Sequence, residues 1–172
     1  MGVKGNAILG LITLAAFIGC GLMAQAQESQ VDYDGFVGLS AEISDYRSSR
    51  LIDLDTFNEM KTDSDTIILD TRSAEAYRLG HIDGAAHLNF SDFTDDKLAQ
   101  LIPSKDTRIL IYCNNNFTDN IAPVPVKRIE LALNVPTFIN LYGYGYENIY
   151  ELDGAYPLAE PNIHWVGEVS PL

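Results

Sequence analysis

Residues that bind metals or form disulfides are few in this sequence. Its 172 residues include two cysteines, Cys20 and Cys113, and three histidines. Cys20 lies in an apolar N-terminal stretch, so removal or lipidation of that stretch leaves Cys113 without a partner for an intramolecular disulfide. His87 and His164 have no partner at metal-ligand spacing, and one cysteine cannot build a zinc site. The sequence therefore predicts no metal or other cofactor, and Cys113 is either buried and inert or kept for its chemistry.

Basic residues are also scarce. The sequence has 11 Lys and Arg against 24 Asp and Glu, and its net charge is −13. Nucleic acids and anionic membrane surfaces are bound through basic patches, so this composition argues against both as partners. The same charge repels a small anionic substrate at long range.

No apolar run in the sequence is long enough to cross a membrane. Ala7–Ile18 is an apolar core of about a dozen residues behind Lys4, shorter than the roughly 20 residues that a spanning helix needs. That length is typical of a signal peptide, and Ala24–Ala26 fits a small-x-small cleavage site. Residues 1–26 are therefore predicted to be a signal peptide of an exported protein, periplasmic or secreted. Two alternatives stay open: a lipoprotein anchored at Cys20, and an uncleaved anchor.

The rest of the chain suits one domain and, we expect, a monomer. Without residues 1–26, 146 of the 172 residues remain, and they contain no internal repeat. Residues 27–50 are polar and acidic, with Leu39, Ile43 and Tyr46 at helical spacing, which predicts an N-terminal extension with a short amphipathic helix. The domain itself is predicted to cover residues 51–172.

Strands and helices alternate in the predicted domain. Short apolar, β-branched runs at about 66–70, 86–88, 108–112 and 148–152 are separated by helical patterns, which predicts an α/β fold with a mostly parallel sheet. Helices are expected from Thr56 to Lys61 behind an Asp55 cap, after a Ser73 cap, from a Ser91 cap to Leu101, and from Thr137 to Tyr144, with a turn at His81–Ala85.

Cys113 directly follows the strand predicted at Arg108–Tyr112. The polar run Asn114–Asn120 comes next and favours a loop. Side chains at the carboxyl ends of parallel strands lie where open α/β sheets bind their ligands. Position alone leaves open whether Cys113 is a functional thiol or a small buried apolar residue.

Several motifs of the chain resemble those of rhodanese-like domains, the sulfurtransferase family. Ile68–Ser73, Ala76–Tyr77 and Gly80–Ala85 resemble its two upstream signatures, and Gly145–Gly154 resembles its closing strand and turn. The resemblance covers roughly Leu51 to Trp165. It implies a three-layer fold with a small, mostly parallel central sheet flanked by helices.

The resemblance also implies a mechanism in which Cys113, the catalytic residue, carries sulfur as a persulfide. The partner would be a small sulfur donor or a persulfide-bearing protein. The loop backbone would turn successive N–H groups toward the sulfur and favour its anion. The residues implied are Asn114, Asn115, Asn116, Phe117 and Thr118 in the loop, with Asp70, Arg72 and His81 as structural support.

The loop nevertheless departs from the family pattern. Asn114–Asp119 contains no Lys or Arg, and Asp119 stands where the related phosphatases carry an arginine that clamps phosphate, so we expect no phosphatase activity. An acidic rim would also disfavour thiosulfate as the donor. Residues 114–136 are predicted to be an insertion, and a loop of this length is usually functional or mobile. A catalytically inactive module that binds a partner or senses sulfur or thiols, and a redox role with an external cysteine, remain alternatives.

Overall fold

The computed structural model describes residues 1–2 and 28–168, so the predicted signal-peptide core and Cys20 lie outside the described residues. The chain divides into two compact units, Met1–Asp32 and Tyr33–Leu172. In the first unit, the described residues form no helix or strand, and the Val31 N–H donates to Ser29 Oγ at 3.2 Å. The second unit contains the whole described fold.

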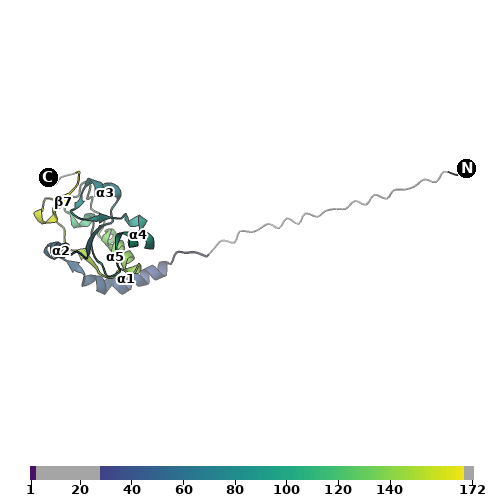
Figure 1. Ribbon diagram of the computed structural model, residues 1–172, viewed down its shortest axis with the longest axis horizontal. Helices are drawn as coiled ribbons and strands as arrows, with labels where there is room; N and C mark the ends of the chain where they lie inside the picture. Colours follow the sequence, from purple (N-terminus) through teal and green to yellow (C-terminus); the bar gives the residue numbers. More distant parts are fainter. Residues whose placement is uncertain (3–27, 169–172) are drawn as a thin grey trace. The chain divides into compact units, whose positions relative to one another are not determined.

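A five-stranded sheet forms the centre of this unit (Figure 1), and every pair of neighbouring strands is parallel. Its two longest strands, β2 and β5, are the β-branched runs that the sequence predicts as strands. The predicted α/β fold with a mostly parallel sheet is confirmed. The strands lie in the order β1 (Leu51–Ile52), β6 (Ile149–Leu152), β5 (Arg108–Tyr112), β2 (Thr66–Asp70) and β4 (Ala86–His87).

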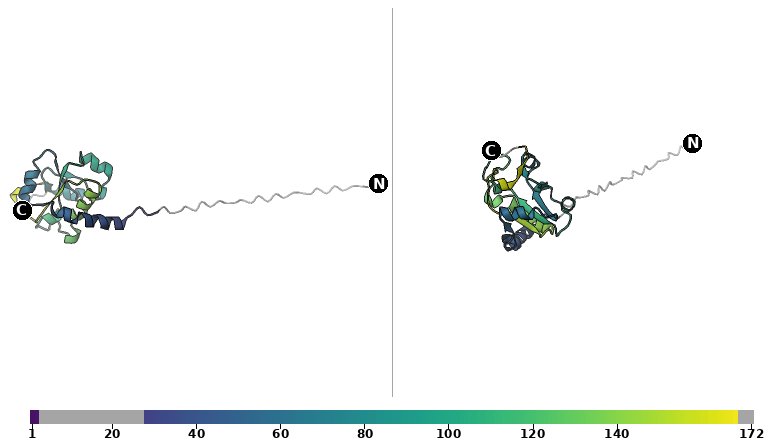
Figure 2. Two further views of the ribbon diagram at one scale, coloured as in Figure 1. Left: turned by 90° about the horizontal axis from the view of Figure 1, so that it is seen from below. Right: turned by 60° about the vertical axis from the view of Figure 1, so that its left-hand side comes forward.

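Alternating side chains of β5 separate two apolar clusters, one on each face of the sheet. Ile109 and Ile111 point to the face covered by α1, α4 and α5, which we call the α5 face. Leu110 and Tyr112 point to the opposite face, which α2 and α3 cover. The helices, seen from further sides in Figure 2, are α1 (Tyr33–Ser48), α2 (Leu54–Met60), α3 (Ala74–Leu79), α4 (Asp95–Leu101) and α5 (Asn134–Gly143). None of the helices within residues 28–168 is long and apolar enough to cross a membrane.

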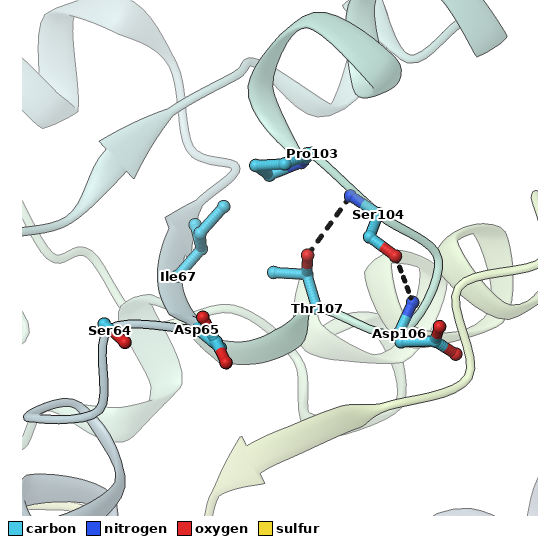
Figure 3. A pocket seen from close by; sticks show the side chains of 7 residues that line it. All are labelled: Ser64, Asp65, Ile67, Pro103, Ser104, Asp106 and Thr107. Carbon is cyan, nitrogen blue, oxygen red and sulfur yellow. Dashed lines mark hydrogen bonds between the residues drawn. The ribbon is translucent and has the colours of Figure 1, made fainter.

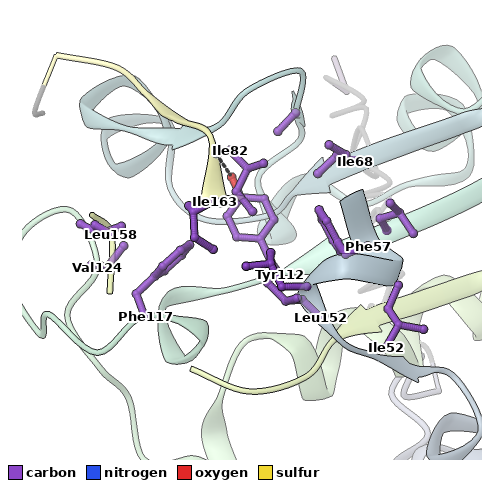
Figure 4. Packing of buried hydrophobic residues seen from close by; sticks show 13 residues of the cluster. Ile52, Phe57, Ile68, Ile82, Tyr112, Phe117, Val124, Leu152, Leu158 and Ile163 are labelled. Carbon is purple, nitrogen blue, oxygen red and sulfur yellow. Dashed lines mark hydrogen bonds between the residues drawn. The ribbon is translucent and has the colours of Figure 1, made fainter. Parts of the chain in front are cut away.

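The predicted insertion is anchored in the core rather than free. Phe117 and Val124, which belong to it, are 1% and 0% exposed and pack with Leu158 and Ile163 in the cluster around Tyr112 (Figure 4). The Phe117 ring lies edge-on to the Tyr112 ring, with 6.0 Å between centroids. Burying a side chain of this size contributes about 1.5–3 kcal/mol, so two such anchors hold the segment on the domain.

Single 3-10 turns lie at Phe90–Asp92, Asn114–Asn116, Ile129–Leu131 and Pro161–Ile163.

A second, two-stranded sheet corrects the turn expected at His81–Ala85. His81–Ile82 form β3, which pairs antiparallel with β7, Trp165–Val166. The local sequence could not show this pairing, because the partner strand lies more than 80 residues further along the chain. Gly80 permits the approach, since a Cβ there would lie 2.4 Å from the Trp165 Nε1.

Two helix starts also differ from the predicted ones. Asp53, rather than Asp55, caps α2, and its carboxylate accepts the Thr56 N–H at 2.8 Å. The helix expected behind Ser91 is a 3-10 turn followed by α4, because Asn89 accepts the Ser91 N–H and Thr94 caps the later helix. In contrast, the cap at Ser73 is confirmed.

The third corrected start concerns the helix closest to the cysteine. α5 begins at Asn134, three residues before the predicted Thr137, and Pro136 lies inside its first turn. A proline is tolerated there because the first N–H groups of a helix have no partner within the helix. The difference matters for function, since it moves the helix N-terminus next to Cys113.

Candidate active site

A buried ion pair between Asp70 and Arg72 marks the carboxyl end of β2. The Arg72 Nη2 lies 2.6 Å from Asp70 Oδ2, and the two side chains are 2% and 0% exposed. The same carboxylate oxygen accepts the Tyr112 hydroxyl at 2.6 Å. Burial, and then the Asp70 charge, raise the pKa of Tyr112 well above its ordinary value, so this phenol remains a donor.

Arg72 also ties three segments together through its remaining donors. Its guanidinium donates to the carbonyl of Gly80 at 2.6 Å, at the end of α3, and to that of Pro123 at 3.4 Å, in the insertion. Both charges of the pair are therefore satisfied within the protein. This placement fits the structural support that the resemblance implies for Asp70 and Arg72.

Two histidines near the ion pair, His81 and His87, are bonded to the main chain. His81 Nδ1 lies 2.8 Å from the Tyr77 carbonyl, and its ring stacks on the Tyr77 ring at 3.9 Å. His87 Nε2 lies 2.9 Å from the Arg72 carbonyl. Within the described part of the chain, no group of three or more His, Cys, Asp and Glu residues could hold a metal.

Cys113 follows β5 directly and is a free thiol, only 1% exposed. Burial raises the pKa of this thiol above its ordinary value, and the negative charge of Glu151 adds to the rise. Hydrogen bonding from the main-chain N–H groups of Asn134, Asn115 and Leu133 lowers the pKa, but by less. Of these three residues only Asn115 belongs to the loop that the resemblance implies, and the other two lie at the start of α5, so burial outweighs them and keeps the thiol protonated.

Asparagine side chains of the loop fold the insertion back toward the cysteine. Asn115 makes two bonds to the main chain of Lys127: its Nδ2 donates to the carbonyl at 2.8 Å, and its Oδ1 accepts the N–H at 3.0 Å. Asn114 Nδ2 donates to the Pro125 carbonyl at 3.1 Å. The hydrogen bonds of these two side-chain amides hold residues 125–127 against the cysteine loop.

Asn116 plays a different part and is 6% exposed. Its Oδ1 accepts the Cys113 N–H at 2.9 Å and the Asn134 Nδ2 at 3.1 Å. Its Nδ2 donates to the carbonyls of Leu152 at 2.7 Å and Gly154 at 3.0 Å. One amide thus joins the end of β5, the start of α5 and the turn after β6.

A pocket of about 320 Å³ lies beside the cysteine loop. Cys113 does not line it, but Asn114 and Asn115, the two residues that follow Cys113, and Leu133 are part of its wall. The wall contains two cationic side chains and no acid. It is lined by Arg72, Ser73, Ala76, Asn114, Asn115, Pro123, Pro125, Lys127, Leu131 and Leu133.

The pocket changes the electrostatic expectation drawn from the sequence. Asp119, the expected source of an acidic rim, turns toward the C-terminal segment, where its Oδ2 accepts the Leu158 N–H at 2.8 Å. Lys127, which is 14 residues beyond Cys113 in the sequence, lines the pocket instead. Because Asp70 neutralises Arg72, an anion entering here meets the positive charge of Lys127.

The structure brings only part of the predicted loop set to this pocket. Asn114 and Asn115 line it, whereas Asn116 is enclosed in its own hydrogen bonds. Phe117 packs edge-on against Trp165 at 5.1 Å, and the Thr118 N–H donates to the Tyr156 carbonyl at 3.0 Å. These last two residues fix the insertion to the C-terminal segment.

Three residues near the thiol were not singled out from the sequence: Lys127, Asn134 and Glu151. Glu151 was detectable, because it is an acid within the otherwise apolar strand β6. Asn134 gave no such signal, because it is the first residue of α5 and not its cap, which is Leu133. The position of Lys127 depends on its two main-chain hydrogen bonds with the Asn115 side chain, which no local sequence pattern predicts.

A second pocket, of about 310 Å³, lies at the opposite end of the sheet (Figure 3). It is found where β2 and β5 begin, between Ile67, Pro103 and the turn that Ser104 and Thr107 stabilise. Open α/β sheets bind ligands at the carboxyl ends of their strands. The Cys113 end is therefore the candidate site.

A parallel sheet with a cysteine at the carboxyl end of its central strand, facing main-chain N–H groups, defines an α/β protein with a cysteine loop. Residues 53–158 match the family model of the rhodanese-like domain, and the chain belongs to that family. The resemblance seen in the sequence motifs is confirmed.

Individual relatives are more distant. Over 115 residues the chain is 31% identical to a protein of Bdellovibrio bacteriovorus named tRNA uridine(34) hydroxylase, a match that covers 63% of this chain and 28% of that protein. Among solved structures, the chain is similar to the BH2092 protein of Bacillus halodurans, with 21% identity, a TM-score of 0.43, and coverage of 69% of this chain and 77% of that one. It is also similar to the Alr3790 protein of Anabaena sp., with 18% identity, a TM-score of 0.46, and coverage of 69% and 93%.

Proposed function

We propose that the protein is a sulfurtransferase that carries sulfur as a persulfide on Cys113. The observation that supports this most is the position of Cys113 at the carboxyl end of the central strand β5, where the main-chain N–H groups of Asn115, Leu133 and Asn134 lower the pKa of its thiol. Such N–H groups stabilise a negative charge on a thiolate or on the outer sulfur of a persulfide. The N-terminus of α5 adds a favourable field, and family membership supports sulfur transfer as the type of chemistry.

The reaction needs two displacements and no external oxidant. The Cys113 thiolate attacks the outer sulfur of the donor, a sulfur–sulfur bond forms, and the donor's own sulfur–sulfur bond breaks to release a thiolate, or sulfite from thiosulfate. An acceptor nucleophile then attacks the outer sulfur of the Cys113 persulfide. The bond between the two sulfurs breaks, and the Cys113 thiolate is regenerated.

The loop has to open for the donor to reach Cys113, because the thiol is 1% exposed. Asn115 and Leu133 line the pocket and also act on the thiol, so a shift of these two residues would connect the sulfur to the pocket. The same shift reduces the burial that raises the thiol pKa. Opening would therefore both expose and activate Cys113.

The pocket supports a small organic persulfide as the donor, rather than thiosulfate. Its volume of about 320 Å³ lies at the lower end of the range typical of small-molecule sites. Pro123, Pro125 and Leu131 offer an apolar wall to an organic group, and Lys127 offers positive charge to an anionic end. Thiosulfate has no carbon group and would use only that charge. A persulfide-bearing protein that inserts such a group is the corresponding protein donor.

Persulfide loading tests the proposal. Wild type and Cys113→Ser are incubated with an organic persulfide or with thiosulfate, and intact mass is measured. We expect wild type to gain the mass of one sulfur atom, faster from the organic persulfide, and the variant to gain none. No gain with either donor would overturn the proposal.

An inactive module that binds a partner or senses thiols is the second candidate, favoured by the burial of Cys113 and its raised pKa. Alkylation of the native protein distinguishes the two candidates. A functional thiol reacts through local opening of the loop, at a rate insensitive to low urea concentrations. A thiol that reacts only through global unfolding shows a rate that rises steeply with urea.

We also propose that the protein acts as a monomer after export. The short apolar segment behind Lys4 and the small residues Ala24 and Ala26 support a cleaved signal. Identifying the N-terminal residue of the mature protein tests the predicted cleavage. An N-terminal Gln27 indicates soluble export, and an N-terminal, lipidated Cys20 indicates an anchor. The net charge of −13 argues against RNA as a partner, although the relative from Bdellovibrio bacteriovorus is named for tRNA.

A further inference from the structure

We propose that the N-terminal helix α1 is part of the cysteine site, because Arg47 neutralises Glu151 next to Cys113. Both are positioning residues that act through the thiol's surroundings. α1 precedes residues 53–158, which match the family model, so the family match does not include this contact. The inference rests on the proposed function only in taking Cys113 as the reacting thiol.

Strand register places Glu151 and Cys113 close together. β5 and β6 are neighbours, and Ile111 lies opposite Glu151. Side chains two residues apart on a strand point to the same face, so Cys113 continues the row of Ile111 on the α5 face. Cys113 and Glu151 are therefore diagonal neighbours on one face of the sheet, and the Glu151 charge acts on the Cys113 thiol.

Glu151 is a buried carboxylate that depends on its partner. It is 6% exposed, and Arg47 clamps it with two bonds, Nη2 to Oε1 at 2.6 Å and Nε to Oε2 at 2.7 Å. A buried carboxylate without a partner is costly, so the clamp holds α1 and β6 together. Arg47 lies in the last turn of α1, which packs against α5.

Asn134 connects this ion pair to the thiol. Its Nδ2 lies 3.3 Å from Glu151 Oε1 and 3.1 Å from Asn116 Oδ1, and its own N–H faces the Cys113 sulfur. A displaced Glu151 therefore disturbs the side chain of a residue whose main-chain N–H lowers the pKa of the thiol. Charge acts in parallel, because the carboxylate opposes ionisation of the thiol and Arg47 offsets it. Of the other segments packed there, α5 contains no charged residue, and the insertion places Lys127 in the wall of the pocket beside the cysteine loop.

The two partners should change the thiol in opposite directions. Arg47→Gln leaves the negative charge unbalanced, so the midpoint of the alkylation pH profile moves up. Glu151→Gln removes that charge, so the midpoint moves down. A shift of about one unit changes the rate below the midpoint roughly tenfold. In the Glu151→Gln background, Arg47→Gln should have little further effect.

The experiment uses the neutral reagent iodoacetamide and the full pH profile of each variant. The plateau at high pH reports opening of the loop, and the midpoint reports the thiol. Arg50→Gln is the matched control, since Arg50 lies over the rings of Tyr46 and Tyr150 at 4.7 and 4.8 Å. Its midpoint should equal that of wild type.

Midpoints that move in the same direction for Arg47→Gln and Glu151→Gln would overturn the proposal, because both changes break the same contact and a purely structural role gives both the same sign. An unchanged midpoint in Arg47→Gln would also overturn it. The assay contains no sulfur donor, so a failure of persulfide loading leaves this result independent, and the reverse also holds.

Discussion

The Asn116 amide offers the sharpest test of how the cysteine loop is held. Asn116→Asp keeps the shape of the side chain and replaces the Nδ2 donor by an oxygen. The two acceptors of that donor, the carbonyls of Leu152 and Gly154 at 2.7 and 3.0 Å, then face a carboxylate oxygen. The bonds from the Cys113 N–H and Asn134 to Oδ1 remain possible.

The expected cost follows from those two contacts. A buried polar group left without a partner costs about 1–3 kcal/mol, and of the two residues Leu152 is buried whereas Gly154 is exposed, so we expect a loss of about 1–3 kcal/mol in the free energy of unfolding. For a domain of this size, each kcal/mol lowers the Tm by about 3–4 °C, so the Tm should fall by roughly 3–12 °C at neutral pH. At acidic pH the introduced carboxyl takes up a proton and regains a donor, so the difference should shrink.

Thermal unfolding followed by circular dichroism measures this loss. Asn148→Asp is the matched control, because Asn148 Nδ2 makes one bond near the surface, to the Asp106 carbonyl at 3.0 Å. Its Tm should fall by much less. Equal losses in the two variants, or a loss at position 116 that does not depend on pH, would refute the reasoning.

Three further predictions concern the scaffold and the thiol. Arg72→Met leaves a buried carboxylate unpaired and should cost about 3–5 kcal/mol in urea unfolding, whereas Arg78→Met, at an exposed ion pair, should change little. Burial raises the pKa of Cys113 above its ordinary value of 9.0, so the thiol ionises at lower pH in the unfolded chain than in the folded one. The stability of wild type relative to Cys113→Ser should therefore be constant below that pH and decline above it. Urea titrations across pH measure this difference. Gly80→Ala should lower the Tm, since its Cβ would overlap the indole next to it, whereas Gly38→Ala, with open space in α1, should be neutral or stabilising by about 0.5–1 kcal/mol.

Local signals in the sequence were sufficient for much of the fold. β2 and β5 are apolar, β-branched runs with turn residues on both sides, and the hydroxyl of Ser73 caps α3 as its position predicts. Where two capping residues competed, the pattern misled, as at Asp53 and Asp55. Signals of this kind fix elements to within a few residues because they act between near neighbours in the chain.

The site was harder to predict than the fold, because contacts between residues distant in sequence build it. The polarity of the loop indicated a ring of N–H groups at Cys113. The burial of Cys113 also depends on the insertion, which hydrogen bonds from Asn114 and Asn115 hold in place. The hydrogen bonds of Asn115 to Lys127 also bring that lysine to the pocket, so a cation stands where the sequence indicated an acidic rim. The ion pair of Arg47 with Glu151 joins residues 104 positions apart, which no periodicity predicts.

The central claim is that Cys113 accepts a sulfur atom and passes it on. The most direct test loads the protein with an organic persulfide, removes the donor by desalting, adds cyanide, and follows intact mass and thiocyanate together. The account predicts that wild type gains one sulfur atom and loses it on adding cyanide, with one thiocyanate formed per loaded protein. Thiocyanate formation that is equal in Cys113→Ser, or a loaded sulfur that cyanide does not remove, would contradict it.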